Sequence, residues 1–421
     1  MTATPPGKLS VVLVCGSFSL GGSERNVIKI ACGLDPARFS VRVVGLSGEG
    51  PLRKEVESCG IPVVATDWTY DPRQQDTDFA RLKEAVAQAA PDILHVFNYP
   101  AVYFGVAAGT AVGVPVRVVA IQAQDTWKGR IERIMDRLVR PAVTLYLADG
   151  EGARRFAIRH QGLDPARVRL LYDGPDLDGM TPSSSREVLR GRLGLRSDCP
   201  VVGVVARLQD RHKGQSVFLR SVAQLPENLD AQFILVGGGE DEAMLRGLAR
   251  DLRLENRVIF AGPQPQLGDV LHALDILVIP SLRYESVPKI LLEGMGVGRA
   301  VIASRVGDIP EFLRDGVTGI LVEPGDPDSL AAAILHLVNH SDAVEALGGA
   351  ARMMLSSKGI TLQQSLKTLA DLYECLATSR EEAPGPLLRS RVRRAMSVYR
   401  LLRLGDERGR WLMSQRPWRR R

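Results

Sequence analysis

Short apolar runs alternate with helical patterns along the first half of the chain. The runs predict buried strands at residues 11–15, 41–44, 62–65, 93–96, 116–121, 144–147 and 168–171. Helical spacing of apolar residues over 23–34, 77–90 and 131–138 fills gaps between these strands, with Ser23 as the expected N-cap of the first helix. Strands that alternate with helices in this way predict a parallel, doubly wound sheet.

A second series of strands and helices begins near residue 200. Strands are expected at 201–206, 232–236, 258–260, 276–279, 300–303 and 319–322, and a helix at 215–225. The intervening segment 174–185, rich in Pro, Gly, Asp and Ser, indicates a linker. A chain of 421 residues, 45% of them apolar, can fill two cores. The expected fold is α/β, with Rossmann-like domains at 1–178 and 186–358 that face each other across a cleft.

The last sixty residues add a helix and a basic tail. Residues 359–380 carry a helical apolar stripe that needs a partner surface, formed by Leu366, Leu369, Leu372, Tyr373 and Leu376. The tail is placed at 384–421. Residues 389–421 hold twelve arginines and two acids, a net charge of +10, whereas the whole chain carries +6. The rest of the chain is therefore mildly acidic, at about −4.

The tail has two open interpretations. Its apolar residues fall on one face of a helix, namely Val392, Ala395, Met396, Tyr399 and Leu402. Such a helix, with arginines around it and with Trp411 and Trp418 beyond, suits an anionic membrane surface. A disordered, solvated basic extension fits equally well. Nucleic-acid binding is not expected, because the body is acidic and shows no recognition module.

Cysteine usage and hydropathy bear on location. The five cysteines, at positions 15, 32, 59, 199 and 375, are scattered and have no metal-ligand spacing, which favours a reducing cytoplasm. Residues 1–9 lack the apolar core of a secretory signal, and no run of eighteen apolar residues could span a membrane. We therefore expect a cytoplasmic protein, peripheral on the inner face of the membrane if the tail binds lipid.

Two glutamates stand eight positions apart after the expected strand 276–279. Glu285 precedes a helix that Pro288 would begin, and Glu293 lies on that helix. The carboxyl ends of parallel strands bind ligands, and helix amides near Ser286 and Val287 would meet an anion. The layout suits a nucleotide sugar, with hydroxyls at both ends and phosphate between. The plain alternative is two solvated glutamates beside an ordinary helix.

Two cations follow the expected strand 201–206. Arg207 and Lys213 would lie at its carboxyl end, where a guanidinium can bind phosphate in a bidentate manner and an ammonium adds a point charge. Taken alone, such residues are usually solvated surface charges. Gly237, the first of three glycines after strand 232–236, would allow a close backbone approach, although a tight turn explains it too.

These motifs resemble the retaining GT-B glycosyltransferases of family 4, over residues 10–378. The resemblance rests on six segments: Gly21-Gly22-Ser23-Glu24-Arg25, Pro91-Asp92-Ile93-Leu94-His95, Val205-Ala206-Arg207-Leu208 with Lys213-Gly214, Phe233 to Gly239, Glu285 to Glu293, and Ile309-Pro310-Glu311 followed by Gly316-Val317-Thr318-Gly319. It implies that Arg207 and Lys213 bind the donor diphosphate, Glu293 the ribose hydroxyls and Glu285 the transferred sugar. Gly21 and Gly22 would approach the diphosphate or the sugar from the first domain. The resemblance also implies that the helix at 359–380 packs back on the N-terminal domain.

Departures from the family pattern lie on the acceptor half. His95 stands alone, because Phe97 replaces a second His, and Gln122 occupies the region where many members have a His. Asp149-Gly150-Glu151 and Asp173-Gly174 replace a common Ser-Glu and Asn-Gly. His95 either contacts the sugar or is a core histidine. The acceptor therefore stays open: a glycan or lipid-linked hydroxyl.

The resemblance implies transfer of a sugar from a UDP- or GDP-sugar with retention of configuration. Preformed cations and helix amides could stabilise the leaving diphosphate without a metal or other cofactor. An NAD-dependent oxidoreductase is disfavoured, since Gly16 to Gly22 lacks the dinucleotide spacing and Gly45 stands near the expected acid. A GT-B nucleotide-sugar epimerase or hydrolase, or a non-catalytic nucleotide-sugar-binding protein, could use the same donor residues.

Overall fold

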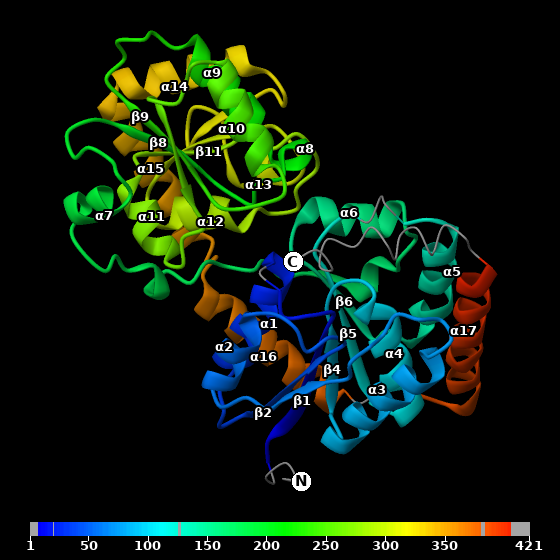
Figure 1. Ribbon diagram of the computed structural model, residues 1–421. Helices are drawn as coiled ribbons and strands as arrows, with labels where there is room; N and C mark the ends of the chain where they lie inside the picture. The colour runs from blue at the N-terminus through cyan, green and yellow to red at the C-terminus, as the bar shows by residue number, and fades with distance from the viewer. Residues whose placement is uncertain (1–6, 20, 125–127, 380–383, 406–421) are drawn as a thin grey trace. The chain divides into compact units, whose positions relative to one another are not determined.

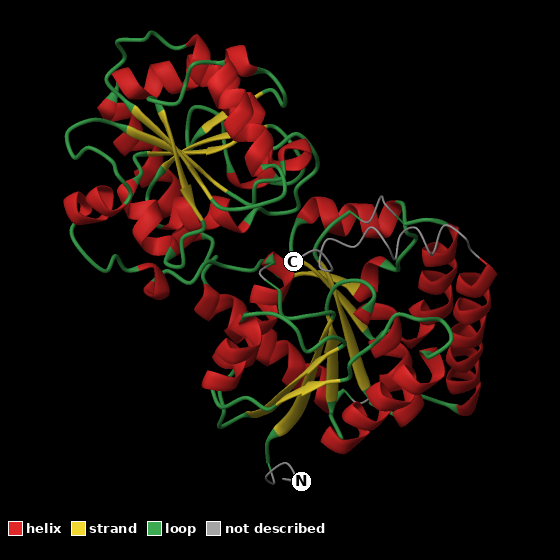
Figure 2. Cartoon of the chain, in the orientation of Figure 1, coloured by secondary structure: helices red, strands yellow, loops and turns green. Residues whose placement is uncertain are grey.

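The computed structural model describes residues 7–19, 21–124, 128–379 and 384–405, which form two compact units. Unit 1 comprises the described residues up to Asp149, Ala153–Leu171 and those from Leu366 onward. Unit 2 comprises Gly150–Gly152 and Tyr172–Ser365. Each unit is a sheet covered by helices on both faces (Figures 1 and 2).

Unit 1 contains a parallel seven-stranded sheet of order β3-β2-β1-β4-β5-β6-β7. Its strands are β1 (Leu9–Cys15), β2 (Phe39–Gly45), β3 (Val63–Ala65), β4 (Ile93–Val96), β5 (Val116–Ile121), β6 (Leu145–Ala148) and β7 (Val168–Leu170). Every strand predicted from the apolar runs is present, within two residues at each end. The expected doubly wound topology is confirmed for this unit.

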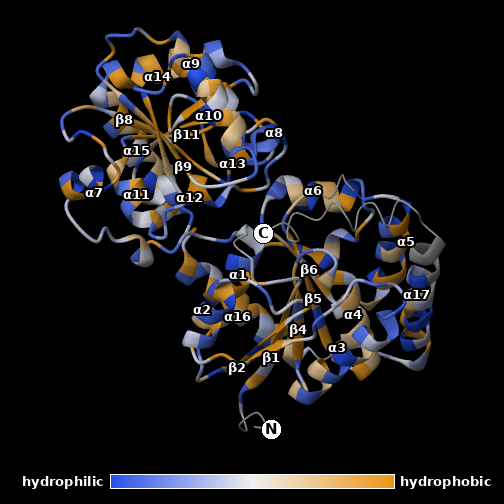
Figure 3. Ribbon diagram, viewed as in Figure 1, coloured by the Kyte–Doolittle hydropathy of each residue, from blue (hydrophilic) through white to orange (hydrophobic). Residues whose placement is uncertain are grey.

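Alternate residues of the strands face two different helical layers. Val12 and Val14 belong to one core cluster, whereas Val11 and Leu13 belong to another. The strands of the sheet are predominantly hydrophobic (Figure 3). The first layer contains α3 (Gln75–Ala89), α4 (Ala101–Val112), α5 (Arg130–Val139), α6 (Glu151–Arg159) and α17 (Pro386–Gly405). The second contains α1 (Gly22–Gly33), α2 (Leu52–Ser58) and α16 (Leu362–Thr378).

Helix α16 supplies part of the unit 1 core. Leu369 and Tyr373 are 1% and 0% exposed and lie in the same cluster as Leu13 and Val27. Arg38, at the start of β2, forms ion pairs with acidic residues on the outer side of α16. The apolar stripe of this helix therefore has its partner surface beside α1.

Helix α17 corrects the interpretation of the tail. Val392, Ala395 and Met396, expected on a membrane-facing surface, are buried in the unit 1 core at 2%, 0% and 6% exposure. Gln75 donates a hydrogen bond to the Met396 carbonyl at 2.9 Å. That face is therefore not available to a lipid, because α4 and α5 already cover it. Trp411 and Trp418 lie outside the described residues, as does the side chain of Leu402.

Unit 2 contains a parallel six-stranded sheet of order β10-β9-β8-β11-β12-β13. Its strands are β8 (Val201–Val205), β9 (Gln232–Val236), β10 (Val258–Gly262), β11 (Ile276–Ile279), β12 (Ala300–Ser304) and β13 (Ile320–Val322). One face packs on α9 (Gln215–Gln224), α10 (Glu242–Asp251) and α14 (Pro327–Asn339). The other packs on α11 (Leu267–Ala273), α12 (Lys289–Gly296), α13 (Ile309–Phe312) and α15 (Ser341–Ser357).

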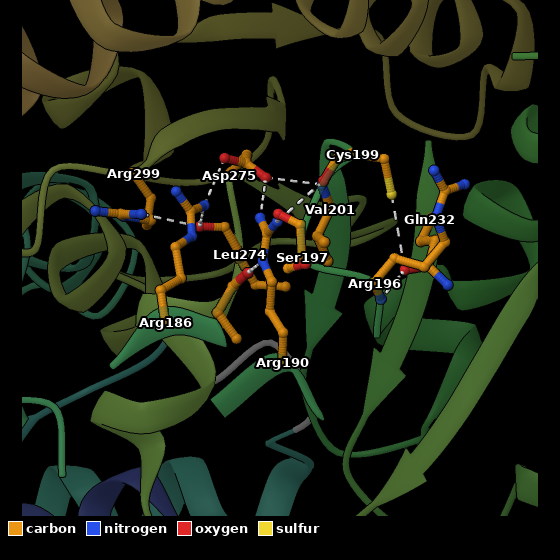
Figure 4. Close-up of polar contacts among 11 residues, drawn as sticks. Arg186, Arg190, Arg196, Ser197, Cys199, Val201, Gln232, Leu274, Asp275 and Arg299 are labelled. Carbon is orange, nitrogen blue, oxygen red and sulfur yellow. Dashed lines mark hydrogen bonds and ion pairs between the residues drawn. The ribbon is translucent and has the colours of Figure 1, made fainter. Parts of the chain in front are cut away.

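An arginine cluster around the buried Arg190 holds α7 (Arg186–Arg192) at the amino-terminal edge of the unit 2 sheet (Figure 4). Asp275, just before β11, accepts hydrogen bonds from the Val201 amide at 2.8 Å and from Arg190 at 2.5 Å. Arg186 also pairs with Asp275, and Arg299 donates to the Leu274 carbonyl at 2.9 Å. The cluster joins β8, β11 and α7 at this edge of the sheet. The loops considered below lie at the opposite, carboxyl edge.

Cys32 of α1 and Cys59 at the end of α2 form a disulfide, with their Cα atoms 5.7 Å apart. Cys15 and Cys199 are buried free thiols and Cys375 is an exposed one. The pair was not expected from the sequence, because only the packing of α1 on α2 brings the two residues together. The scattered cysteines had favoured a reducing cytoplasm. Because two of them form a disulfide, cysteine usage no longer supports that inference. No helix in the described part of the chain is long and apolar enough to cross a membrane.

Candidate functional site

An ion pair joins two of the expected site residues at the carboxyl edge of the unit 2 sheet. Lys213 donates from Nζ to Glu285 Oε1 at 2.5 Å, and Ser281 Oγ donates to the same oxygen at 3.0 Å. His212 Nε2 lies 3.4 Å from it. The Glu285 side chain is only 10% exposed. Lys213 and Glu285, each expected at the carboxyl end of its own strand, therefore lie next to each other in the structure.

A short helix presents Lys213 to Glu285. Helix α8 (Asp210–Lys213) follows β8 and ends at Gly214, whose φ of +67° is a left-handed conformation. A Cβ at Gly214 would lie 2.0 Å from the Pro280 carbonyl oxygen, so only glycine allows this approach to the loop after β11. The Leu282 amide donates to the His212 carbonyl at 2.9 Å and fixes the two loops together.

The environment keeps Glu285 ionised. Burial alone would raise its pKa, but the hydrogen bond from His212 and the charge of Lys213 outweigh that effect and lower the pKa to about 2. His212 was not singled out from the sequence, although it stands beside Lys213 in the same motif. Its position in the one-turn helix α8 is the signal that would have identified it.

A second loop fixes the backbone on either side of Glu285. The Asp308 amide donates to the Glu285 carbonyl at 3.0 Å, and Tyr284 donates from its hydroxyl to Asp308 Oδ2 at 3.1 Å. Gly307, with φ of +57°, lies against the Glu285 carbonyl, so a side chain there would collide with it. Neither Tyr284 nor Asp308 was expected from the sequence to position Glu285.

Arg207 follows β8 and is exposed. Among the described residues, none pairs with its guanidinium, whereas its carbonyl accepts a hydrogen bond from Gln215 at 2.8 Å. The structure thus places Arg207 in the loop that leads to Lys213, but does not join it to Glu285. A solvated guanidinium at the carboxyl end of a parallel strand is available to an anion.

Gly237 has a structural explanation. Its φ is +136°, and a Cβ there would lie 2.0 Å from the Ala206 carbonyl oxygen. The Leu208 amide donates to the Gly238 carbonyl at 3.1 Å. The glycines therefore allow the loop after β9 to pack on the loop that carries Arg207, and a contact with ligand is not needed to account for them.

The helix after Glu285 begins one residue later than expected. Pro288 is its N-cap with extended ψ, and α12 starts at Lys289, so Ser286 and Val287 belong to the preceding loop. Lys289 forms an ion pair with Asp173, the residue that departs from the family pattern. Glu293, 8% exposed, is buried on α12. Its burial fits a carboxylate held in a fixed orientation rather than a solvated surface charge.

In unit 1, His95 is a core residue. It is 2% exposed on β4, and its Nδ1 lies 2.6 Å from the Tyr373 hydroxyl of α16. Its ring centroid is 4.1 Å from that of Phe97. Burial lowers the pKa of His95 to about 3, so the imidazole is neutral at pH 7. Of the two interpretations of His95, the geometry favours the core histidine over the sugar contact.

The early glycine loop starts α1. Gly21 is the N-cap and Gly22 the first helical residue, so the expected cap at Ser23 is wrong by two positions. The side chain of Asn98 links this helix to the sheet: it donates to Glu24 Oε1 at 3.0 Å and accepts from the Gly16 amide at 3.0 Å. Burial raises the pKa of Glu24. Asn98, which follows β4, was not expected as a site residue.

A cavity of about 250 Å³ lies inside unit 1, at the carboxyl ends of β4 and β5. Asn98 and Tyr99 after β4 line it, together with Gln122 after β5 and Lys128 and Arg140 around α5. Gln122 was noted in the sequence only as a departure. Among the described side chains, no group of three or more His, Cys, Asp or Glu residues is placed to hold a metal ion.

Two family models match the chain. The model of the glycosyl transferase 4-like domain matches residues 21–174, and that of the glycosyl transferases group 1 matches residues 199–340. Together they cover well over half of the sequence.

Curated relatives share about a third of their residues with parts of the chain. A D-inositol 3-phosphate glycosyltransferase of Mycobacterium ulcerans is 37% identical over 193 residues, which is 44% of this chain and 40% of the relative. One of Corynebacterium kroppenstedtii is 30% identical over 267 residues, 61% of this chain and 58% of the relative. The chain thus spans about half the length of these relatives.

Solved structures have the same fold. Anabaena Alr3699/HepE in complex with UDP-glucose superimposes with a TM-score of 0.77 at 23% identity, covering 87% of this chain and all of that one. WaaG, a glycosyltransferase involved in lipopolysaccharide biosynthesis, gives 0.67 at 18% identity and covers 86% and 99%. Both likenesses confirm the expected GT-B fold.

Proposed function

Because the chain belongs to the family of glycosyl transferases group 1, we propose that it moves a sugar from a nucleoside-diphosphate sugar to an acceptor hydroxyl with retention of configuration. The observation that carries this proposal is the half-buried Lys213–Glu285 pair at the carboxyl edge of the unit 2 sheet. Arg207, whose guanidinium has no partner among the described residues, lies in the loop that leads to Lys213. Cation and carboxylate lie side by side there, as recognition of a phosphate next to a hydroxylated sugar requires.

The donor diphosphate interacts with Arg207 and Lys213. Both are cations before any ligand arrives, so they stabilise the charge that develops on the leaving diphosphate without reorganisation. The backbone of Ser286, Val287 and Pro288 precedes α12, whose free amides add a positive dipole end. Glu293 accepts hydrogen bonds from the ribose. In this proposal the nucleotide is UDP or GDP, and no metal or other cofactor takes part.

Glu285 orients the transferred sugar. As a carboxylate with a pKa of about 2 it accepts hydrogen bonds from sugar hydroxyls and does not deliver a proton at neutral pH. The acceptor hydroxyl attacks the anomeric carbon on the face from which the diphosphate leaves, and a diphosphate oxygen takes its proton. Gly21 and Gly22 approach the donor through their backbone. His95 packs in the core of unit 1 and does not contact the sugar in this proposal.

The comparisons support a nucleotide-sugar donor more strongly than any acceptor. Alr3699/HepE holds UDP-glucose, and the curated relatives are D-inositol 3-phosphate glycosyltransferases. For this chain we place the acceptor among glycans and lipid-linked hydroxyl compounds, as in the biosynthesis of a surface glycan or glycolipid. The alternatives, an epimerase or hydrolase, need no acceptor, and a binding protein forms no product.

An anionic membrane surface is the proposed partner of the outer face of unit 1. Exposed arginines lie on α17 at 391, 393 and 394 and on α5 at 130, 133 and 137, and the two helices pack together. The described part of α17 contains no acidic residue. This arginine face replaces the apolar face considered from sequence, and it supports the proposal that the protein is peripheral on the cytoplasmic face of a membrane.

The proposal is tested by product analysis with a donor labelled at the anomeric carbon. We expect release of nucleoside diphosphate that depends on added acceptor, and a product whose anomeric configuration equals that of the donor in ¹³C NMR. An inverted product would remove the retaining mechanism. Release without any acceptor would indicate a hydrolase, and a new nucleotide sugar an epimerase.

A further inference from the structure

The disulfide of unit 1 joins the far ends of two neighbouring helices. Cys32 lies in the last turn of α1 and Cys59 directly follows α2, 27 positions further along the sequence. The two helices pack on each other, and each follows its own strand of the sheet, β1 or β2 (Figure 1). Both cysteines are exposed, so a reductant in solution can reach the pair.

The remaining cysteines differ from this pair in reactivity. Cys15 and Cys199 are buried, at 1% and 4% exposure. Burial raises the pKa of Cys15 to about 12 and raises that of Cys199 as well, so few of these thiols ionise at neutral pH. Cys375, on α16, is an exposed free thiol. Among the five cysteines, all of them described, the disulfide and Cys375 are therefore the sulfur groups open to exchange.

The segment that leads into α2 supports the glycine-rich loop before α1. The Phe18 amide donates to the Glu49 carbonyl at 3.0 Å, and the Leu52 amide donates to the Phe18 carbonyl at 3.1 Å. Leu52 is the first residue of α2. Residues 16–19 of the glycine-rich loop thus lie on the backbone of segment 46–52, so the position of this loop depends on that of α2.

Helix α2 has a small share of the core. Of its seven residues, all described, Leu52 and Val56 are buried. The helix leads to β3, a three-residue strand at the edge of the sheet. Short elements that bury few apolar side chains open locally at a low free-energy cost. Loss of the crosslink should therefore release α2 and segment 46–51 before the rest of unit 1.

We propose that Cys32–Cys59 is a site of thiol–disulfide exchange, through which a dithiol reductant controls the glycine-rich loop. A thiolate of the reductant attacks one sulfur and displaces the other, which leaves as a thiolate and takes a proton. The second thiol of the reductant then resolves the mixed disulfide, so two electrons and two protons pass to Cys32 and Cys59. The effect on the reaction rests on the proposed function, in which Gly21 and Gly22 approach the donor.

The proposed cytoplasmic location supports this role for the pair. Thiols in the cytoplasm are kept reduced, and the disulfides that form there are usually transient and redox-sensing. A structural disulfide would be expected in the core, out of reach of reductants, whereas accessible disulfides are the labile ones. The exposure of Cys32 and Cys59 therefore matches the regulatory kind.

The test compares the oxidised and the reduced full chain. Native protein is treated with dithiothreitol, and its free thiols are alkylated and located by mass spectrometry. We expect both cysteines of the pair to be reduced without denaturant. Amide hydrogen exchange over residues 46–58 should then be faster by about tenfold or more, while β1 and β4 stay protected. The kcat/KM for the donor should fall by about tenfold to a hundredfold, because the glycine-rich loop loses its fixed position.

Two variants locate the effect. Cys32→Ser/Cys59→Ser should show the reduced behaviour with and without dithiothreitol, and reduced wild type gives the same comparison without any substitution. Cys375→Ser, which removes the exposed free thiol, should respond as wild type.

Three results would overturn the proposal. They are a disulfide that stays intact in the native protein under dithiothreitol, unchanged hydrogen exchange over 46–58 after reduction, and equal kcat/KM of the oxidised and reduced forms. A chain that transfers no sugar in either form contradicts the proposed function instead. In that case alkylation and hydrogen exchange, which need no substrate, still decide whether the pair exchanges and releases α2.

Discussion

Lys213 Nζ lies 2.5 Å from Glu285 Oε1 at the carboxyl edge of the unit 2 sheet. The pair is buried enough to be oriented, yet its lysine is 27% exposed and can exchange its partner for a phosphate. The charge of Lys213 helps to keep the carboxylate ionised. In the proposed donor complex, the same ammonium bridges the carboxylate and the diphosphate.

Substitution of Glu293 and of Glu285 should affect different steps, nucleotide binding and turnover respectively. Glu293→Gln should weaken nucleoside diphosphate binding by about threefold to tenfold, because one hydrogen bond of a carboxylate to the ribose is lost. Glu285→Gln should leave nucleotide affinity within a factor of two and lower kcat, since in the proposed complex Glu285 contacts the sugar and not the nucleotide. Calorimetric titration with nucleoside diphosphate and steady-state kinetics separate the two effects. Equal loss of binding in both variants contradicts the division of roles.

Acid sensitivity should report the state of Glu285. Its pKa falls from 4.5 to about 2 on folding, so its contribution to stability is present above pH 4.5 and is lost as the pH falls toward 2. The loss should reach up to about 3 kcal/mol over that window. Chemical unfolding at pH 5, 4 and 3 should show wild type losing more stability than Glu285→Gln. Parallel pH profiles for the two proteins would show that the pair is not formed.

His95 gives a second pH prediction, in a higher range. Its folded pKa of about 3 lies below the ordinary 6.5, so the neutral imidazole stabilises the fold above pH 6.5 and the benefit is lost as the pH falls through that range. Between pH 7 and pH 5 wild type should lose about 2 kcal/mol relative to His95→Gln. Nucleotide affinity of the variant should match wild type at pH 8. A large loss of kcat with full stability would restore a sugar-contacting role.

Membrane binding should depend on the arginine face of unit 1. Arg391, Arg393 and Arg394 are exposed on α17 and none has an ion-pair partner among the described residues, so changing all three to Gln should leave the fold intact. Each arginine near an anionic surface contributes about 1 kcal/mol, so the triple variant should float far less with anionic vesicles. Arg220→Gln, exposed in unit 2, is the matched control. Equal flotation of the variants would remove the membrane partner.

The sequence predicted the sheets well because apolar runs of three to six residues between turn signals leave few alternatives in a doubly wound fold. Residues 93–96, 116–121, 232–236 and 276–279 match the observed strands at both ends. Helix starts were less certain, as at Ser23, because the cap depends on which backbone amides the preceding loop leaves free. The face of α17 was misassigned because an amphipathic stripe does not say which surface covers it.

Site residues that follow strands were predictable, since the carboxyl edge gathers them whatever the details of packing. Arg207, Lys213 and Glu285 are of this kind. The contacts of His212, Tyr284 and Asp308 around Glu285 arise from loops that meet only in three dimensions. The role of His95 could not be predicted in this way. Its strand was predicted correctly, but its partner Tyr373 lies 278 residues away in the sequence.

The central claim is that Arg207 and Lys213 bind the diphosphate of a nucleotide sugar. Isothermal titration of UDP and of GDP into wild type, Arg207→Ala, Lys213→Ala and the exposed control Arg220→Ala tests it most directly. A charge-assisted contact is worth about 1.5 to 3 kcal/mol, so each site variant should bind one of the two nucleotides more than tenfold more weakly, with unchanged thermal stability for Arg207→Ala. Wild-type affinity in both site variants, or no binding of either nucleotide to wild type, would contradict the account.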